Sequence, residues 1–323
     1  METTITEIGD RVFRLSTYLP EVAPPAGFTM NQFLVDADEP LLFHCGPRAM
    51  FPLVAEALAN IRPVESLRWI SFGHIESDEC GAMNQWLAAA PDAEVAFNPL
   101  GCDVSVNDLA DRPPRIVAPD EILDLGDRRV RMLPTPHVPH NWEAQVLYEE
   151  VTGTLLCGDL LSQLDGRVAA TEDDIVDAAI TAEDAFGATG LTPSTAPTLR
   201  ALADLDPKVL AIMHGSSLVG GDPSDQLRRL ADVYETRLEA ATLTSNWRTG
   251  TRNALLRPPE QGCSAARRSS DPTPRATAFE LFRKNARSSA SLRSAHHAHA
   301  RSPDQVAVRP PCVSGGATAA GRR

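Results

Sequence analysis

The stretch from Trp69 to Trp86, "WISFGHIESDECGAMNQW", gathers one histidine and three carboxylates directly after an apolar run and directly before a helix-like one. The four residues are His74, Glu76, Asp78 and Glu79. Carboxylates this close repel one another unless water or a cation offsets their charge. In an extended or looped backbone His74, Glu76 and Asp78 can turn toward the same side. The types and the spacing therefore favour a metal-ligand cluster.

Three further sites place polar residues directly after an apolar, strand-like run. "RRVRMLPTP" leads into His137 and His140, "TLLCG" into Asp159, and "VLAIM" into His214. Ligands in α/β proteins commonly gather at strand ends, where loops on a rigid sheet converge. Two metal ions about 3.5–4 Å apart, bridged by one carboxylate, would explain a single aspartate far along the chain.

Each of these residues also has a simpler explanation. Asp78 and its neighbours could cap a helix, where the positive end of the helix dipole favours carboxylates. His140 could be a solvated loop histidine in "PTPHVPHNW", where prolines exclude a helix, and Asp159 an ordinary turn residue. His214 could be a core histidine, and His44 in "LLFHCG" is expected to be structural or to support a ligand. The simpler explanations weaken together, because residues 1–244 contain five histidines and four of them lie at these strand ends.

The elements that would position these residues alternate between strand-like and helix-like patterns over residues 1–244. Such alternation is typical of a layered α/β fold, and "VTGT" predicts a hairpin turn. The predicted strands cover residues 11–19, 31–37, 40–46, 67–73, 93–98, 128–133, 144–150, 153–159 and 208–215. The predicted helices cover residues 47–61, 80–90, 174–186, 195–205 and 223–241.

The net charge of −13 conceals a split between two regions. Residues 1–244 carry 16 Lys and Arg against 39 Asp and Glu, a balance of −23, which makes nucleic acid an unlikely partner of this domain. Residues 245–323 carry 14 against 4, a balance of +10, and are rich in Arg, Ser, Ala and Pro. Such a composition cannot bury enough apolar surface to offset its ordering entropy, so we expect a disordered basic tail. The histidines at 296, 297 and 299 fall in this tail.

Several classes of protein are disfavoured by what the sequence lacks. No apolar run is long enough for a membrane span, and the first residues do not read as a secretory signal. The six cysteines form no CxxC pair, which argues against a disulfide framework and against a thiolate zinc site. We therefore expect a cytoplasmic protein that does not enter the membrane.

Taken with their order, these motifs resemble the metallo-β-lactamase superfamily over residues 5–243. The resemblance implies an αββα sandwich with metal ligands at one edge of its two sheets. "HIESDE" is most similar to the H-x-E-x-D-H motif of the flavodiiron and oxygen-binding diiron branch, whereas hydrolases of the superfamily have H-x-H-x-D-H. Glu79 departs from both motifs, because it stands where the last histidine is expected.

The resemblance also implies a set of ligands. "TPHVPHNWEAQVLY", "TGTLLCGD" and "LAIMHGSS" match the later motifs, and the first of them favours His140 over His137. One metal would be held by His74, Glu76 and His140, the other by Asp78 and His214, with Asp159 bridging. Glu79 could coordinate, hydrogen-bond a ligand, or do neither, and His137 is a candidate for a supporting role.

The expected activity follows from the same resemblance and from the ligand types. Carboxylate-rich sites suit iron or manganese better than zinc, so we expect two Fe ions, with Zn or Mn as alternatives. The protein would bind or reduce O₂, as a sensor or with a separate electron donor, and a homodimer is compatible with this. A flavodiiron protein continues into a flavodoxin domain, but no strand–helix alternation follows residue 244, so no FMN is expected in this chain. The alternatives are a metal-dependent hydrolase of an ester, thioester or lactone, and a non-catalytic binding module.

Overall fold

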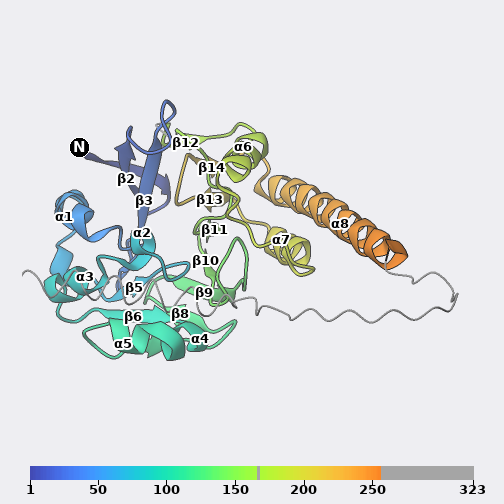
Figure 1. Ribbon diagram of the computed structural model, residues 1–323. Helices are drawn as coiled ribbons and strands as arrows, with labels where there is room; N and C mark the ends of the chain where they lie inside the picture. The colour runs from blue at the N-terminus through green and yellow to red at the C-terminus, as the bar shows by residue number, and fades with distance from the viewer. Residues whose placement is uncertain (166–167, 256–323) are drawn as a thin grey trace, which may run out of the picture. The chain divides into compact units, whose positions relative to one another are not determined.

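Two seven-stranded sheets form the centre of the computed structural model, within the residues it describes, 1–165 and 168–255 (Figure 1). The first sheet has the order β1-β2-β3-β4-β5-β6-β7 and the second β12-β14-β13-β11-β10-β9-β8. The strands of the first sheet are β1 (Thr3–Gly9), β2 (Val12–Leu19), β3 (Phe28–Val35), β4 (Leu41–Phe43), β5 (Trp69–Ser71), β6 (Glu94–Phe97) and β7 (Arg115–Ile116). Those of the second are β8 (Ile122–Asp124), β9 (Arg129–Pro134), β10 (Gln145–Glu149), β11 (Thr154–Leu156), β12 (Ala170–Thr171), β13 (Val209–Ala211) and β14 (Ser217–Val219).

Each sheet combines antiparallel and parallel pairing. In the first sheet, β1 to β4 pair in antiparallel fashion, and β4 to β7 are parallel neighbours. In the second sheet, β8 to β11 are antiparallel, and β11 pairs with β13 in parallel. The hairpin predicted at "VTGT" joins β10 to β11, with Glu149 opposite Thr154. Parallel strands end at the same edge of a sheet, so β5 and β6 on one side and β11 and β13 on the other present their loops together.

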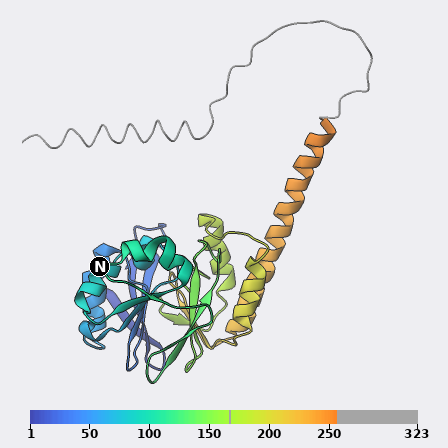
Figure 2. The same ribbon diagram turned by 90° about the horizontal axis from the view of Figure 1, so that it is seen from below.

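Helices cover the outer face of each sheet, which gives four layers (Figure 2). The first half contributes α1 (Phe51–Ala59), α2 (Ser77–Cys80), α3 (Met83–Ala89), α4 (Pro99–Gly101) and α5 (Asn107–Leu109), with the 3₁₀ turns η1 (Arg48–Met50) and η2 (Val64–Ser66) and the π-helical stretch η3 (Cys102–Val106). The second half contributes α6 (Val176–Phe186), α7 (Thr195–Ala203) and α8 (Pro223–Leu255).

Three buried clusters hold these layers together. One lies between the sheets and joins Phe33 and Phe43 of the first sheet to Met132 and Leu147 of the second. A second packs α1 and α3 on the first sheet, and a third packs α6, α7 and α8 on the second. Since apolar burial is the main favourable contribution to folding, each layer is fixed by the sheet beneath it.

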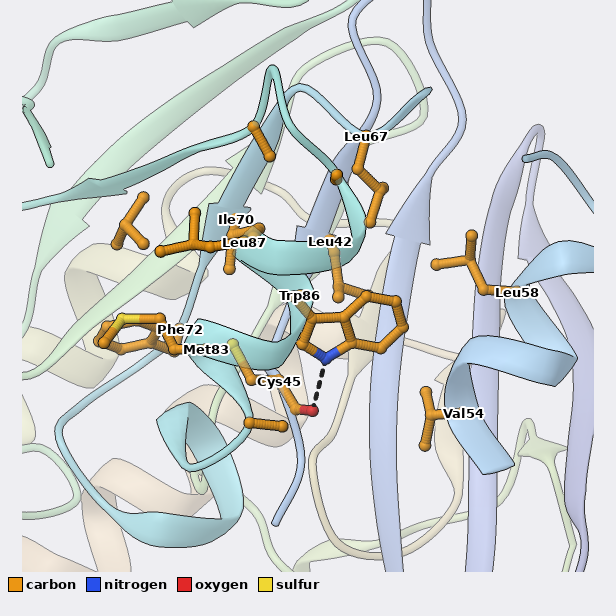
Figure 3. Packing of buried hydrophobic residues seen from close by; sticks show 14 of the residues in the cluster. Leu42, Cys45, Val54, Leu58, Leu67, Ile70, Phe72, Met83, Trp86 and Leu87 are labelled. Atoms are coloured by element: carbon orange, nitrogen blue, oxygen red, sulfur yellow. Dashed lines mark hydrogen bonds between the residues drawn. The ribbon is translucent and has the colours of Figure 1, made fainter. Parts of the chain in front are cut away.

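The packing of α3 shows how the first sheet anchors the segment that follows β5 (Figure 3). Trp86 is fully buried among Leu42, Val54 and Ile70. Its indole Nε1 donates a 2.9 Å hydrogen bond to the carbonyl oxygen of Cys45. A buried indole N–H needs such a partner, so this bond fixes α3 against the turn that follows β4.

The predicted fold class, an α/β sandwich of the metallo-β-lactamase type, is confirmed by the two sheets and their helical layers. Every strand and helix predicted from the pattern has a counterpart. The elements that were not predicted are β1, β7, β8, β12, β14, η2, α2 and the segment from α4 to α5. Helix α8 continues to Leu255, so the expected boundary at residue 244 falls inside a helix. Most of the expected tail, residues 256–323, lies outside the described residues. No helix among the described residues is long and apolar enough to cross a membrane.

Candidate metal centre

The residues after β5 leave the strand and form a short loop and a single helical turn, α2. His74 is buried, whereas Glu76 is half exposed in its side chain. Glu76 occupies the N-cap position of α2 with extended backbone, yet its side chain makes no capping hydrogen bond. The simple explanation that the acidic residues cap a helix therefore fails for Glu76. Its carboxylate is directed to two histidines instead.

Four side chains from distant parts of the chain converge on one point. His74 Nε2 lies 2.9 Å from Glu76 Oε2 and 2.9 Å from His140 Nε2. His140 Nε2 lies 3.5 Å from Asp159 Oδ2. One ligand atom from each of His74, Glu76, His140 and Asp159 lies within 4.8 Å of the others. Ligand atoms about 2.0–2.2 Å from a shared ion are separated by roughly 3–3.6 Å, so this group has the spacing of a metal site.

A second group lies beside the first and shares Asp159 with it. His214 Nε2 lies 3.3 Å from Asp78 Oδ2 and 3.1 Å from Asp159 Oδ1. The two oxygens of Asp159 thus face different groups, Oδ2 toward His140 and Oδ1 toward His214. A carboxylate in this position is what two neighbouring ions would share.

The hydrogen bonds behind His214 show why a cation fits this group. His214 Nδ1 lies 2.7 Å from the carbonyl oxygen of Thr29, which can only accept, so Nδ1 carries the proton. In the neutral ring Nε2 is then a lone pair, and it faces the carboxylate oxygens of Asp78 and Asp159. Asp78 Oδ1 and Asp159 Oδ1 are buried without a hydrogen-bond partner. Acceptors that converge without a donor are stabilised by a positive charge.

The pKa values of these groups point the same way. Burial disfavours the protonated form of His74, but Glu79, Glu76 and Asp159 outweigh burial and raise its pKa to about 11. Burial likewise opposes protonation of His214, yet Asp159 and Asp78 raise its pKa to about 10. Protons on the two imidazoles supply the positive charge that these carboxylates require. A bound cation would take over that role.

Glu79 lies behind His74. Its Oε2 accepts a 2.6 Å hydrogen bond from the backbone N–H of His74, and its Oε1 lies 3.1 Å from His74 Nδ1. The same carboxylate lies 3.4 Å from Nδ1 of His44, and all three side chains are almost fully buried. Burial raises the pKa of Glu79, but His44 and His74 prevail and hold it well below the usual value. Of the roles left open for Glu79, the geometry favours hydrogen bonding to a ligand.

His140 and His137 differ in their surroundings although they share one loop. The loop between β9 and β10 is closed by the backbone N–H of Thr135, which donates to the carbonyl oxygen of Ala144 at 2.8 Å. His140 is partly buried and faces the first group. His137 is exposed and is not among the described residues that line the neighbouring cavity. The loop therefore places the preferred histidine at the centre and the other at the surface.

Some supporting residues were not recognised from the sequence. Glu143 is buried, and its Oε1 accepts a 3.1 Å hydrogen bond from the backbone N–H of Ile75, which ties the His140 loop to the His74 loop. Thr29 orients His214 through its carbonyl oxygen, which no side-chain pattern can reveal. A Cβ on Gly73 would lie 3.0 Å from Glu79 Oε2 and 3.3 Å from Gly158 Cα, so glycine lets the loops after β5 and β11 approach closely.

A cavity of about 720 Å³ opens directly beside the two groups. Glu76, Asp78, His140, Asp159 and His214 form part of its lining. The other described walls come from β3 and the loop before it, the loops after β5 and β9, the segment after β11, α6 with the residues that follow it, and α8. The candidate metal centre is therefore accessible to a small molecule.

Comparison with known proteins agrees with this architecture. The sequence profile described as ODP family beta lactamase matches residues 28–215, more than half of the chain, which include all six expected ligands. The chain belongs to the ODP family of beta lactamases. The resemblance to this family that the sequence motifs indicated is thereby confirmed.

Two solved structures illustrate what this ODP-family chain is similar to in fold. Rubredoxin oxygen:oxidoreductase from Desulfovibrio gigas matches with a TM-score of 0.60 and 18% identity, over 73% of this chain and 62% of that one. The Flv1 flavodiiron core from Synechocystis sp. matches with a TM-score of 0.60 and 21% identity, over 74% of this chain and 61% of that one. These likenesses show the fold.

A curated relative gives a similar picture. The putative diflavin flavoprotein A 6 from Nostoc sp. is 24% identical over 168 residues, which is 49% of this chain and 30% of the relative. The ODP-family chain thus spans less than a third of that relative and less than two thirds of the two solved structures named above.

Proposed function

We propose that this chain holds a dinuclear iron centre that binds or reduces O₂. The observation that carries the proposal is the placement of Asp159, whose Oδ2 lies 3.5 Å from His140 Nε2 and whose Oδ1 lies 3.1 Å from His214 Nε2. His74, Glu76 and His140 would hold one ion, Asp78 and His214 the other, and Asp159 would bridge them.

The donor set supports iron over zinc. Three imidazoles and three carboxylates make an oxygen-rich, anionic set, whereas hydrolytic zinc sites favour nitrogen-rich sets. Bound iron would supply the electron-transfer chemistry that binding or reduction of O₂ requires. Manganese suits the same donors and is an alternative metal.

The protein's own groups would hold and orient the ligands. The carbonyl oxygen of Thr29 accepts from Nδ1 of His214, and the carboxylate of Glu79 faces Nδ1 of His74. Each contact directs the Nε2 atom of its histidine toward the centre. Electrons would come from a separate donor.

The names of the similar proteins support the same function. One of them is called an oxygen:oxidoreductase and another a flavodiiron core. The chain shares their fold, and its "HIESDE" motif has Glu76 where a hydrolase of this superfamily would have histidine. Both facts favour O₂ over an ester as the partner of the centre.

One observation favours the second candidate, a metal-dependent hydrolase of an ester, thioester or lactone. The cavity of about 720 Å³ is far larger than O₂ needs, and a carbonyl substrate would fit it. In that case the metal ions held by these residues would supply the activation of water for attack on the carbonyl carbon.

The decisive experiment combines metal analysis with anaerobic reduction. We expect two iron ions per chain when iron is supplied, and rapid oxidation of the reduced protein after stopped-flow mixing with O₂. Asp78→Ala should lower the stoichiometry toward one, since it removes a ligand of one ion only. A protein that binds no metal under any supplementation would refute the proposal. If the reduced iron form is stable in air and the zinc form cleaves thioesters or lactones, the hydrolase candidate is correct.

A further inference from the structure

The cavity beside the metal centre is large enough for an organic molecule. Its volume of about 720 Å³ lies within the range of roughly 300–1,000 Å³ that is usual for small-molecule sites. A diatomic gas needs only a small part of this space, since even a water molecule accounts for about 30 Å³ of liquid. The cavity therefore has room for an organic molecule in addition to a diatomic gas.

The walls next to the metal centre are apolar and aromatic. Phe28 stacks on the imidazole of His214, with ring centroids 4.2 Å apart and an interplanar angle of 25°. Phe186 meets Phe28 edge to face at 5.8 Å. Buried Ala179 and Ala182 of α6 leave open the space in front of these rings. An apolar body placed here would be removed from water on several sides.

The charges of the lining restrict the headgroup of the occupant. Among the described residues that line the cavity, none is Lys or Arg. Two divalent ions held beside Glu76, Asp78 and Asp159 would be the source of positive charge for an anionic headgroup, in place of a basic side chain of the described lining. Glu79 lies on the opposite side of His74 and outside the lining.

The part of the lining formed by α6, the residues that follow it and α8 discourages a second anion. Glu183 lines the cavity there, and its Oε2 accepts a 2.7 Å hydrogen bond from the hydroxyl of Thr189. Thr189 Oγ1 in turn lies 3.0 Å from the Tyr234 hydroxyl oxygen. This wall offers hydroxyls and a carboxylate but no described cation, so a dianion spanning the cavity would be repelled.

We infer that the cavity binds an organic monocarboxylate with an aromatic or branched aliphatic body. Its carboxylate would lie at the metal centre, and its body between Phe28 and helix α6. This inference rests on the proposed metal centre, because the ions supply the charge that attracts the headgroup. It adds an organic ligand to a site otherwise assigned to O₂.

The test measures binding to the full chain loaded with zinc, which is redox-silent. Isothermal titration calorimetry compares three ligands. 4-Phenylbutyrate has a long apolar body, acetate has none, and phthalate carries a second negative charge. We expect 4-phenylbutyrate to bind at least about tenfold more tightly than acetate, because each buried methylene contributes several-fold. Phthalate should bind more weakly than 4-phenylbutyrate. Equal affinities for all three, or equal binding to metal-free protein, would overturn the inference.

Variants of α6 show whether the body occupies the cavity. Ala179→Leu fills the space and should weaken 4-phenylbutyrate binding about tenfold, while acetate binding is unchanged. Ala178→Leu makes the same change on an exposed position of the same helix and should have no effect. If Ala179→Leu fails to fold, Phe186→Ala serves instead, because that side chain is 51% exposed and its loss should weaken binding several-fold. Unchanged binding in the folded variants would overturn the inference.

The outcomes separate this inference from the proposed function. Tight binding of 4-phenylbutyrate to the zinc form, together with an iron form that does not react with O₂, would refute the O₂ proposal alone. Rapid reaction with O₂ in the iron form, together with no preference for 4-phenylbutyrate over acetate, would refute the organic ligand alone.

Discussion

The carboxylate of Glu79 lies 3.1 Å from Nδ1 of His74, on the side of the imidazole opposite the nitrogen that faces Glu76 and His140. Glu79, which stands at a ligand position of the family motif, thus contacts the far side of the candidate ligand His74. The same carboxylate lies 3.4 Å from His44, so one buried acid connects two buried imidazoles. This arrangement leads to the first prediction.

Replacing Glu79 should weaken metal binding without removing a ligand. Glu79→Ala leaves His74 Nδ1 unpaired and the ring free to turn, and we expect about 10- to 100-fold loss of metal affinity. Glu79→Gln keeps the shape and an acceptor oxygen, so it should retain most of the affinity. Competition with a chelator measures both constants. If Glu79→Ala binds metal as tightly as the unmodified chain, Glu79 has no orienting role.

The two histidines of the loop between β9 and β10 should differ sharply. His140→Ala removes a group 2.9 Å from His74 Nε2, so the metal content should fall strongly. His137→Ala alters an exposed side chain outside the cavity and should leave the metal content close to that of the unmodified chain. Elemental analysis of the two purified variants compares them directly. A larger loss in His137→Ala would show that the loop places the wrong residue at the centre.

The stability of the metal-free protein should fall as the pH rises above neutral. In the folded chain burial opposes protonation, but neighbouring carboxylates raise the pKa of His214 to about 10 and of His74 to about 11. Both exceed the ordinary value of about 6.5. A raised pKa contributes stability that is fully present below the unfolded-state pKa and is lost as the pH rises through the folded-state pKa.

Denaturation midpoints between pH 6 and pH 11 measure this effect. The metal-free chain should become less stable across that window, whereas the metal-loaded chain should change less, because a cation replaces the two protons. Parallel profiles for the two forms would contradict the assignment of these histidines.

Removing residues 256–323 should leave the metal content and the thermal midpoint unchanged. The buried clusters of the described structure are built from residues up to Tyr234, and the sequence after Leu255 lacks the apolar periodicity of a core element. The cut belongs after Leu255 rather than after residue 244, because α8 continues that far. Thermal denaturation of the truncated and full chains provides the comparison, and a midpoint several degrees lower in the truncated chain would contradict the expectation.

The strands that carry the site were predictable because their apolar composition indicates that they are buried. The runs "WISFG", "TLLCG" and "VLAIM" are short and apolar, and each is followed by a polar residue. Strands β5, β11 and β13 lie within these three runs. The edge strands β7 and β12 have two residues each and are not fully buried, so no pattern marked them. The segment from α4 to α5 was missed because the π-helical stretch Cys102–Val106 separates two α-helical pieces of three residues each and breaks the α-helical repeat.

The separation of Asp78 from Glu79 was not predictable from their adjacency. Both lie in the single turn α2, where consecutive side chains diverge by about 100°. Asp78 therefore faces His214, while Glu79 turns back into the protein toward His44. Glu143 and Thr29 escaped notice for another reason. Each acts on a residue far along the chain, through a backbone group, and such a contact leaves no local pattern.

The candidate ligands are drawn from both sheets, and this division has a mechanical consequence. His74, Glu76 and Asp78 follow β5 of the first sheet, while His140, Asp159 and His214 follow strands of the second. The chain passes from β7 to β8 through an exposed stretch around residues 118–120. Metal ions bound by ligands from both sheets would hold the two halves of the domain, residues before and after this stretch, together. A chain nicked within 118–120 should then stay joined when loaded with metal, and separate more readily once a chelator removes it.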